Sequence, residues 1–233
     1  MNWKEIKTSD DNTHFLLDGK QIYGKTFIEV LKFHFPGIAP VLDNSGAFHI
    51  DIDGKELYEN RYSRTFGFYC NRASVIENNY WFHIDEKGER VYSDSYLWTG
   101  NYQENICTVR NDKNKYFHID INGKQIYTDN YIYAGDYKDG IACVKSQDGF
   151  YRHIDIKGDF INNKSFLDLD VFHKNFATAK DERGWFHIDR NGEALYDNRY
   201  LLIEPFYNGF AVVTYFDNKK LIIDENGKII LNL

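Results

Sequence analysis

The residues whose types and spacing could do chemistry in this chain are five His-x-Asp pairs. They are His49 and Asp51, His83 and Asp85, His118 and Asp120, His153 and Asp155, and His187 and Asp189. On an extended strand the two side chains of a pair share one face and lie about 7 Å apart. Such a pair could bind a metal ion or act as a general base. A metal-dependent hydrolase that uses these columns is therefore one hypothesis for the chain.

The number of copies favours a structural role for the pairs instead. Catalysis requires one site, whereas five copies at a fixed step indicate that every repeat needs the two residues for itself. We interpret each aspartate as the first residue of a turn, where its carboxylate accepts backbone N–H groups. We interpret each histidine as a buried ring that is hydrogen-bonded to a neighbouring repeat and stacked in a column with its copies. On this interpretation the chain has no catalytic residue and no metal site.

The pairs belong to a repeat that runs along the chain. Measured at the histidine position, with weaker copies at His14 and Ile222 included, the steps are 35, 34, 35, 35, 34 and 35 residues. A constant step in this range is the signature of a repeat architecture. We predict a polar lead-in over residues 1–12, with a short helical turn or a frayed strand. Residues 13–233 are predicted to form a single repeat domain of about six and a half β-repeats.

One template describes the elements that must position each pair. The histidine lies in a strand such as 80–85, where the alternation of side chains puts Phe82 and Ile84 on the face opposite His83. A glycine follows each aspartate by three residues, which fits a type I turn that ends in a left-handed residue. These glycines are Gly54, Gly88, Gly123, Gly158, Gly192 and Gly227. After the turn the chain is predicted to return as a second strand, for example over 88–92.

The remainder of the unit also has the composition of strands. Aromatic residues recur nine, thirteen and nineteen residues after the histidine position, and a small residue followed by valine comes next, as in Ala73 and Val75. Aromatics make up 17% of the residues, and there are only three prolines to interrupt strands. No stretch has helical periodicity. The sequence therefore predicts an all-β fold of tandem β-hairpin or meander repeats of about 35 residues.

The arrangement of the repeats has two candidate forms. The histidine strand occurs seven times and the small-x-Val strand six times, so a half-unit is left over. The step of 35 residues is also short beside the roughly 40–50 residues of common propeller blades. Both observations favour an open, β-solenoid-like array whose terminal half-units act as caps. A six-bladed β-propeller is the alternative.

The template resembles that of the bacterial WG-repeat proteins. Their unit has the order Trp-Gly-(Tyr/Phe)-Ile-Asp, a turn with Gly, a hydrophobic strand, Tyr, and then Phe-x-x-Gly-x-Ala-x-Val. Trp81, Ile84, Asp85, Gly88 and Tyr96 keep that order, and so do residues 206–213. The resemblance covers about residues 13–230, with Phe82 and Phe186 where the family has glycine and histidine where it has an aromatic. It implies a divergent tandem β-repeat with a non-catalytic or accessory role, and it implies no substrate.

Composition excludes several other classes of function. The chain has 28 basic and 35 acidic residues, a net charge of −7, and no cluster of cations of the kind that binds phosphate backbones. We therefore expect no nucleic-acid partner. No apolar run approaches the roughly 20 residues that span a bilayer, and no glycine-rich phosphate loop opens a helix, so we expect no membrane association and no cofactor. Cys70, Cys107 and Cys143 are odd in number and unpaired in spacing, which favours a reduced, cytoplasmic protein.

Binding residues are expected at the positions that vary between repeats, since the constant positions are committed to packing. Fifteen residues after the histidine position lie Arg64, Trp98 and Tyr133. Trp98 and Tyr133 belong to adjacent repeats and could form an aromatic strip for a peptide or a sugar, although the simpler interpretation, and the favoured one, is that they extend the aromatic core. We predict a non-catalytic scaffold that binds another protein, and a carbohydrate-binding repeat protein is the second hypothesis.

Overall fold

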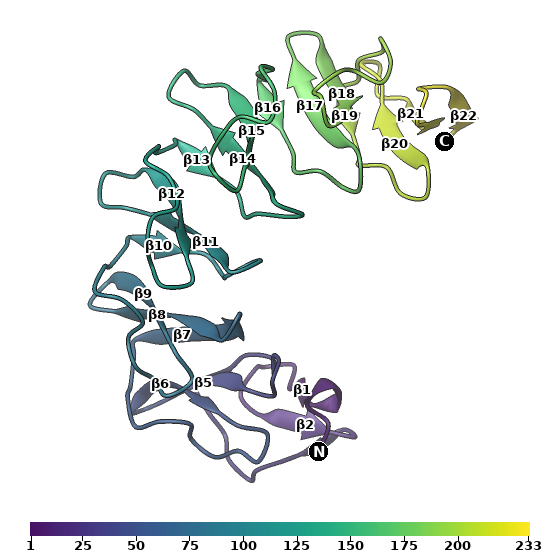
Figure 1. The fold of residues 1–233 in the computed structure, drawn as a ribbon. Coiled ribbons are helices and arrows are strands. Elements are labelled where there is room, and N and C mark those ends of the chain that lie inside the picture. Colours follow the sequence, from purple (N-terminus) through teal and green to yellow (C-terminus); the bar gives the residue numbers. More distant parts are fainter. The chain divides into compact units, whose positions relative to one another are not determined.

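The computed structural model describes residues 1–233 and consists of one short 3-10 helix and 22 strands (Figure 1). The helix, η1, is Trp3–Glu5. The strands are β1 (Lys7–Thr8), β2 (Phe15–Leu17), β3 (Lys20–Gln21), β4 (Glu29–Val30), β5 (Ala39–Asp43), β6 (Gly46–Ile50), β7 (Arg64–Tyr69), β8 (Arg72–Glu77), β9 (Tyr80–Ile84), β10 (Trp98–Thr99), β11 (Ile106–Arg110), β12 (Tyr116–Asp120), β13 (Tyr133–Ala134), β14 (Ile141–Lys145), β15 (Tyr151–Asp155), β16 (Asp168–Leu169), β17 (Ala177–Asp181), β18 (Gly184–Ile188), β19 (Leu202–Ile203), β20 (Phe210–Thr214), β21 (Lys220–Asp224) and β22 (Ile229–Asn232).

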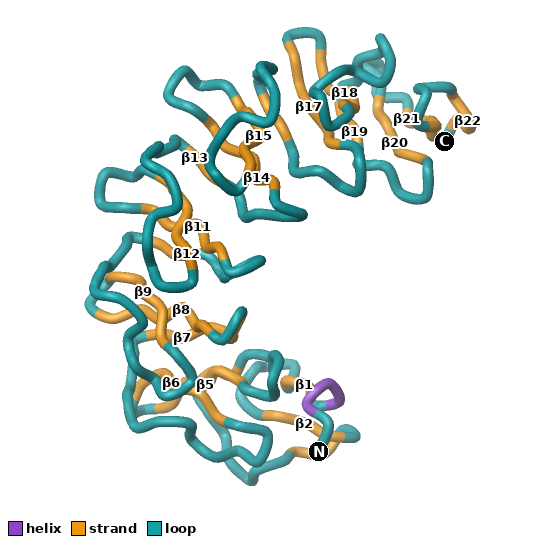
Figure 2. The backbone as a smooth tube through the Cα atoms, viewed as in Figure 1, coloured by secondary structure: helices purple, strands orange, loops and turns teal.

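These strands form seven small sheets, each made from strands that follow one another along the chain. Six sheets have three strands, and the seventh, β19-β20-β21-β22, has four. Figure 2 shows how short the strands are beside the loops that join them. In the third sheet, β8 and β9 pair antiparallel with Ala73 opposite Ile84 and Val75 opposite Phe82. The prediction of an all-β chain of tandem β-repeats is confirmed.

The boundaries of the sheets do not follow the sequence template. The main hairpin joins the small-x-Val strand to the histidine strand that comes after it, as in β8 and β9, so one sheet takes strands from two sequence repeats. The strand predicted to follow the Asp-x-x-Gly turn is reduced to a single bridge in five repeats, for example Ile84 with Arg90. That part of the prediction was wrong for these repeats. Only β3 and β22 extend the bridge into a strand.

The first sheet takes one of its strands from the segment predicted to be a polar lead-in. β1 pairs with β2, with Lys7 opposite Leu16 and Thr8 opposite Phe15. Ile6 is buried, and Trp3 of η1 packs against the same apolar cluster. The expected helical turn and frayed strand within residues 1–12 are therefore both present, and they belong to the folded repeat.

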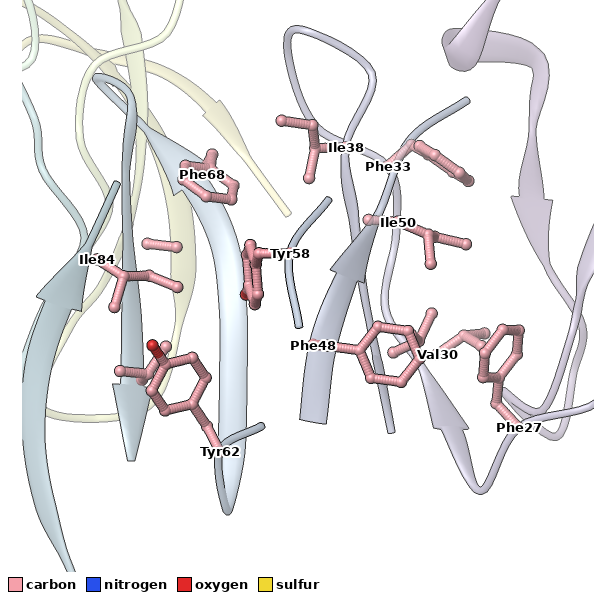
Figure 3. Close-up of a cluster of buried hydrophobic side chains, with 14 of the residues drawn as sticks. Phe27, Val30, Phe33, Ile38, Phe48, Ile50, Tyr58, Tyr62, Phe68 and Ile84 are labelled. Carbon is pink, nitrogen blue, oxygen red and sulfur yellow. The ribbon is translucent and has the colours of Figure 1, made fainter. Parts of the chain in front are cut away.

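The core lies between successive sheets, so that both faces of the histidine strands are covered. Phe48, His49 and Ile50 of β6 are all buried, although their side chains alternate between the two faces of the sheet. Figure 3 shows Tyr58 between the sheet that carries Ile50 and the sheet that carries Phe68. A half-exposed strand would have kept only every second residue buried. In this sheet, burial on both faces means that other parts of the chain pack against each side.

The turns after the histidine strands have the predicted geometry. The carboxylate of Asp85 accepts the backbone N–H groups of Lys87 and Glu89, both at 2.9 Å. The backbone N–H of Gly88 donates to the carbonyl of Asp85, and the φ of Gly88 is +76°. The prediction of a positive φ is confirmed for the six predicted glycines, where φ lies between +75° and +85°. The aspartates therefore close turns, as predicted.

The chain divides into two compact units by its internal contacts. The N-terminal unit is Met1–Asn114 with His118–Gln125, and the C-terminal unit is Lys115–Phe117 with Ile126–Leu233. The division passes through β12. No helix in the structure is long and apolar enough to cross a membrane.

Candidate functional site

Four of the repeated histidines join their own sheet to the next one. His49 lies in β6 of the second sheet, and its Nε2 atom bonds the backbone carbonyl of Phe66 in β7 of the third sheet at 2.7 Å. His83, His153 and His187 make the same bond to the carbonyls of Gly100, Asp170 and Glu204 at 3.2, 2.8 and 2.9 Å. Each acceptor lies 17 residues after its histidine. All five predicted histidines are buried, as expected.

Four of the histidine rings pack on an aromatic ring of the next sheet and do not stack on other histidines. The ring centroids of His49 and Phe68 are 4.6 Å apart, and those of His187 and Phe206 are 3.8 Å apart. His83 with Tyr102 and His153 with Phe172 repeat this contact. The prediction of a column of stacked histidines was therefore wrong. In these four repeats, the aromatic residue nineteen positions after the histidine is the surface on which the ring lies.

The hydrogen bonds fix the tautomer of these rings. A backbone carbonyl only accepts, so the Nε2 atom of His83 carries the hydrogen and its Nδ1 atom is the acceptor. The hydroxyl of Tyr92 donates to that Nδ1 atom at 2.5 Å, and Tyr196 does the same for His187 at 2.5 Å. Tyr58 is the equivalent partner of His49. Burial lowers the pKa of His49, His83, His153 and His187 to about 4, which keeps these rings neutral.

This geometry leaves the rings of His49, His83 and His187 without a lone pair for a metal ion or for proton abstraction. Nε2 carries a hydrogen and Nδ1 accepts one from a tyrosine, while the neighbouring aspartate is used in its own turn. The structure contains no group of three or more His, Cys, Asp or Glu residues arranged to hold a metal ion. The His-x-Asp pairs therefore act as parts of the scaffold.

The fifth repeat departs from this scheme. Asn162 takes the place of the tyrosine nine residues after His153, so the ring has no tyrosine hydroxyl at its Nδ1 atom. The Oδ1 atom of Asn162 accepts the backbone N–H of Lys164, whereas its buried Nδ2 atom has no hydrogen-bond partner. This histidine therefore has fewer hydrogen-bond partners than His49, His83 and His187.

The predicted binding residues lie on the first strands of three sheets, β7, β10 and β13. Arg64 is exposed and forms an ion pair at 2.8 Å with Glu29, the residue at the same repeat position one sheet earlier. Trp98 is half-buried and pairs with Arg110. Tyr133 is 44% exposed and belongs to the other compact unit. The aromatic strip from Trp98 to Tyr133 stays a prediction, whereas the Arg64 side chain is already paired within the fold.

Tyr133 forms part of an aromatic row on the C-terminal unit. It pairs across β13 and β14 with Lys145, which in turn pairs with Tyr151 of β15. The ring centroids of Tyr133 and Tyr151 are 6.4 Å apart, and those of Tyr116 and Tyr133 are 5.9 Å apart. The ammonium group of Lys145 lies 4.9 Å from the Tyr151 ring centroid. In this row Tyr133 is exposed, Tyr116 and Tyr151 are half-buried, and the cation lies beside Tyr151.

A groove in the C-terminal unit is a second candidate site, and it was not predicted from the sequence. Its volume is about 670 Å³. Residues from three successive repeats line it: Lys138, Asp170, Val171, His173, Glu204, Pro205, Phe206 and Tyr207. Lys138, His173 and Tyr207 occupy the same position in their repeats, at the start of the turn that leads to the small-x-Val strand.

The histidine bonds fix the backbone of the two acidic residues of this groove, and the hydroxyl of Thr178 donates to the carboxylate of Asp170. Asp170 and Glu204 directly follow the first strands β16 and β19, and their carbonyls accept the hydrogens from His153 and His187. Their backbone N–H groups donate to the next strand, to Thr178 at 2.9 Å and to Val212 at 3.0 Å. Tyr207 also lines the groove and is 73% exposed. Constant residues therefore position side chains that vary between repeats. That variation, seventeen and twenty residues after each histidine, is the sequence signal that would have identified the groove.

Comparison with known proteins shows similarity of fold alone. No protein-family model matches the chain, and no curated protein matches it in sequence. A crystal structure of the eukaryotic initiation factor is similar with a TM-score of 0.61 and 12% identity, over 98% of this chain and 72% of that one. BamB from Moraxella catarrhalis is similar with a TM-score of 0.52 and 13% identity, over 98% and 86%. The C-terminal WD40 domain of Sif2, at 9% identity over 91% and 70%, has a TM-score of 0.43, which is too low to carry an argument.

Proposed function

We propose that this protein is a non-catalytic β-repeat module that binds a segment of another protein in the groove of its C-terminal unit. The observation that carries the proposal is the composition of the groove. Its lining comes from three successive repeats, and most of the positions involved vary between these repeats, whereas the histidines and aspartates beneath them are constant. Repeat proteins that bind extended partners use their variable surface positions in this way.

The chemistry of the lining indicates what the bound segment must offer. Asp170 and Glu204 supply two carboxylates, and the exposed faces of Val171 and Tyr207 supply apolar and aromatic contact area. A lysine or arginine beside an aromatic or aliphatic residue would satisfy both kinds of contact. The net charge of −7 for the whole chain also favours binding of a basic segment.

A peptide selection tests this function. Random peptides displayed on phage are selected on the full chain, and the enriched sequences are measured in solution by fluorescence polarisation. We expect sequences that combine a basic and an aromatic residue. Glu204→Lys and Tyr207→Ala should each weaken binding at least about tenfold, because they remove a charge-assisted contact or an aromatic anchor. Phe216→Ala, an exposed residue in the turn after β20, is the matched control and should bind normally. Equal binding by all variants would refute the groove as the site.

The aromatic row at Tyr133 favours a second candidate function, the binding of a carbohydrate. Exposed aromatic faces stack on the apolar faces of sugar rings, and the exposed ring of Tyr133, next to two half-buried tyrosines and Lys145, supports such a surface. A glycan array probed with the full chain and with Tyr133→Ala distinguishes the two functions. Glycan binding that is lost in Tyr133→Ala and kept in Glu204→Lys would favour the carbohydrate function over the peptide one.

We also propose that the chain is a divergent WG-repeat protein and that it functions in the cytoplasm. The order of the residues that match the WG-repeat template, around Trp81 and over 206–213, supports the first proposal. The three free cysteines, two of them buried in the core, support a reducing compartment. Measuring the free thiols of protein purified from its native cells would test the second.

A further inference from the structure

A hollow of about 90 Å³ lies beside Ala47, the second residue of β6, in the N-terminal unit. Leu31 and Leu42 of the second sheet contribute apolar walls, and Arg64 of β7 in the third sheet also lines the hollow. The guanidinium of Arg64 pairs with the carboxylate of Glu29 at 2.8 Å, so an ion pair joins the two sheets at this point. None of these residues lines the groove of the C-terminal unit.

The residue two positions before the repeated histidine is unusual in this repeat. Ala47 pairs with Leu42 across the hairpin in the way that Trp81 pairs with Ile76 one repeat later. The two positions are therefore equivalent, and the small side chain of Ala47 stands where a ring is found elsewhere. Four other repeats have a large aromatic residue at this position: Trp81, Tyr116, Tyr151 and Trp185.

The walls of the hollow correspond to the residues that contact these rings in other repeats. Leu31 stands seventeen residues after its histidine position, as Phe66 does one repeat later. The rings of Phe66 and Trp81 are stacked, with centroids 5.0 Å apart and planes at 11°. The position of Leu42 is taken in two later repeats by lysines that lie beside the rings of Tyr151 and Trp185: Lys145 and Lys180. The hollow thus retains the surroundings of a ring without the ring itself.

The volume and the ion pair determine how a ring can enter from outside. A cavity of about 150 Å³ holds a benzene molecule, so the hollow accepts a whole ring only when the pair of Arg64 and Glu29 moves aside. These side chains are 48% and 38% exposed, and an ion pair of this kind contributes little to stability. A guanidinium gains a cation–π contact when it lies over a ring, as Arg61 does at 3.9 Å from the ring centroid of Phe48.

We infer that the hollow beside Ala47 is an anchor site for one aromatic side chain, a tryptophan or a tyrosine, of a partner protein. The ring stacks on Leu31, and the guanidinium of Arg64 covers its other face. The released carboxylate of Glu29 accepts the indole N–H or the phenol O–H. Aromatic side chains in such pockets are frequent anchors of protein interfaces. The site lies outside the groove, and the inference does not rest on the peptide-binding function.

Capped amino acids test the site on the full chain. Protein with ¹³C-labelled leucine methyl groups is titrated with N-acetyl-tryptophan amide, N-acetyl-tyrosine amide and N-acetyl-leucine amide, and the methyl signals are followed by NMR. The signals of Leu31 and Leu42 are assigned by substitution. We expect both to shift with either aromatic amide, at a dissociation constant at least roughly tenfold lower than that of the leucine amide.

Two variants and one control locate the bound ring. Ala47→Tyr fills the hollow with the residue that two other repeats have there, so it should bind neither aromatic amide and should melt no lower than the wild type. Leu31→Ala removes the wall on which the ring stacks at a half-buried position, and it should weaken binding at least about fivefold, read at Leu42. Tyr133→Ala in the aromatic row should bind normally.

Several results would overturn the inference. Signals of Leu31 and Leu42 that do not move with either aromatic amide, up to its solubility, show that no ring enters. Equal affinity for the leucine amide shows that the hollow does not select rings. A folded Ala47→Tyr variant that binds as the wild type does places the ring elsewhere, and if that variant does not fold, unchanged affinity in Leu31→Ala leads to the same conclusion.

Discussion

The ring of Tyr92 lies against Gly123 of the next repeat, in the space where a side chain at residue 123 would begin. A Cβ atom at this glycine would meet the carbons of the tyrosine ring at less than 3 Å. The same ring donates its hydroxyl hydrogen to His83. Tyr92 therefore serves two contacts at once, and the glycine is needed both for its left-handed backbone and for the space it leaves.

Replacing Gly123 with alanine should destabilise the protein for both reasons. Gly149 is the matched control, since its φ of +87° is equally left-handed but nothing lies within 4 Å of a Cβ there. We expect Gly149→Ala to cost about 1 kcal/mol of unfolding free energy from backbone strain alone. Gly123→Ala should cost roughly 1–3 kcal/mol more, because the Tyr92 ring must move. Urea unfolding of both variants measures the difference, and equal losses would mean that the ring contact contributes nothing.

The stability should fall as the pH drops from about 6.5 to about 4. Four buried histidines have folded pKa values of about 4 against 6.5 when unfolded, so between these values the unfolded chain binds more protons. Their contribution is complete above pH 6.5 and is lost towards pH 4, at about 1.4 kcal/mol per pH unit for each histidine. Urea unfolding across this range measures the slope. His187→Gln should reduce that slope by about one histidine's share, whereas an unchanged slope would contradict the assignment.

Removing the tyrosine hydroxyl that donates to His187 should destabilise the protein. Tyr196→Phe leaves the buried Nδ1 atom of His187 without a donor, for which we expect a loss of about 1–3 kcal/mol. Tyr80→Phe, at an exposed ring, is the control and should change stability by less than about 0.5 kcal/mol. Chemical denaturation of the two variants side by side gives the comparison, and the hypothesis fails if they lose the same amount.

Restoring the tyrosine in the fifth repeat should have the opposite effect. Asn162→Tyr would supply the missing donor to His153 and remove the buried Nδ2 atom that has no partner. The ring would displace the flexible side chain of Lys164 from Gly192 and break its exposed ion pair with Glu193, which is worth little. We expect a gain of about 0.5–2 kcal/mol, read from the melting temperature and urea midpoint. A destabilised variant would show that this repeat is packed around the asparagine.

Truncation after residue 219 tests the predicted open array. The cut removes β21 and β22 and leaves β19 and β20 as a hairpin. If repeats contribute independently with their neighbours, the 1–219 fragment should remain folded with a lower urea midpoint. In a six-bladed ring the lost strands would open the circle and unfold much of it. Circular dichroism and urea unfolding beside the full chain distinguish these outcomes.

Features that repeat in the sequence were predictable because the same residue types at the same spacing form the same local structure in each repeat. The glycine φ, the aspartate turn and the burial of the histidines follow from residue type and period alone. The bond from His83 to Gly100 was not predictable, because its acceptor is a backbone atom and any residue can stand there. The sequence template also grouped the strands wrongly into sheets. The loop between the two strands of the main hairpin varies in sequence, whereas the Asp-x-x-Gly turn is constant, so the template paired the strands on either side of that turn.

The candidate site was only partly accessible from the sequence. Tyr133 was predicted from its variable position and is exposed, whereas Arg64 is occupied by Glu29. The groove depends on side chains that come from three repeats and have no common chemistry, such as Lys138, His173 and Tyr207. A search of the sequence for residues that recur between repeats does not find these groove residues, because they vary between repeats.

The offset between sheet and sequence repeat has a consequence for how such a chain can lengthen or shorten. A sheet such as β7-β8-β9 begins in one 35-residue unit and is completed by the first strand of the next. The unit that folds is therefore a cyclic permutation of the unit that recurs. Duplication of one recurring unit, cut at any phase, adds one whole sheet and preserves every turn. The same offset means that no cut at the sequence boundary releases an intact sheet, since each one is closed by a strand that belongs to its neighbour.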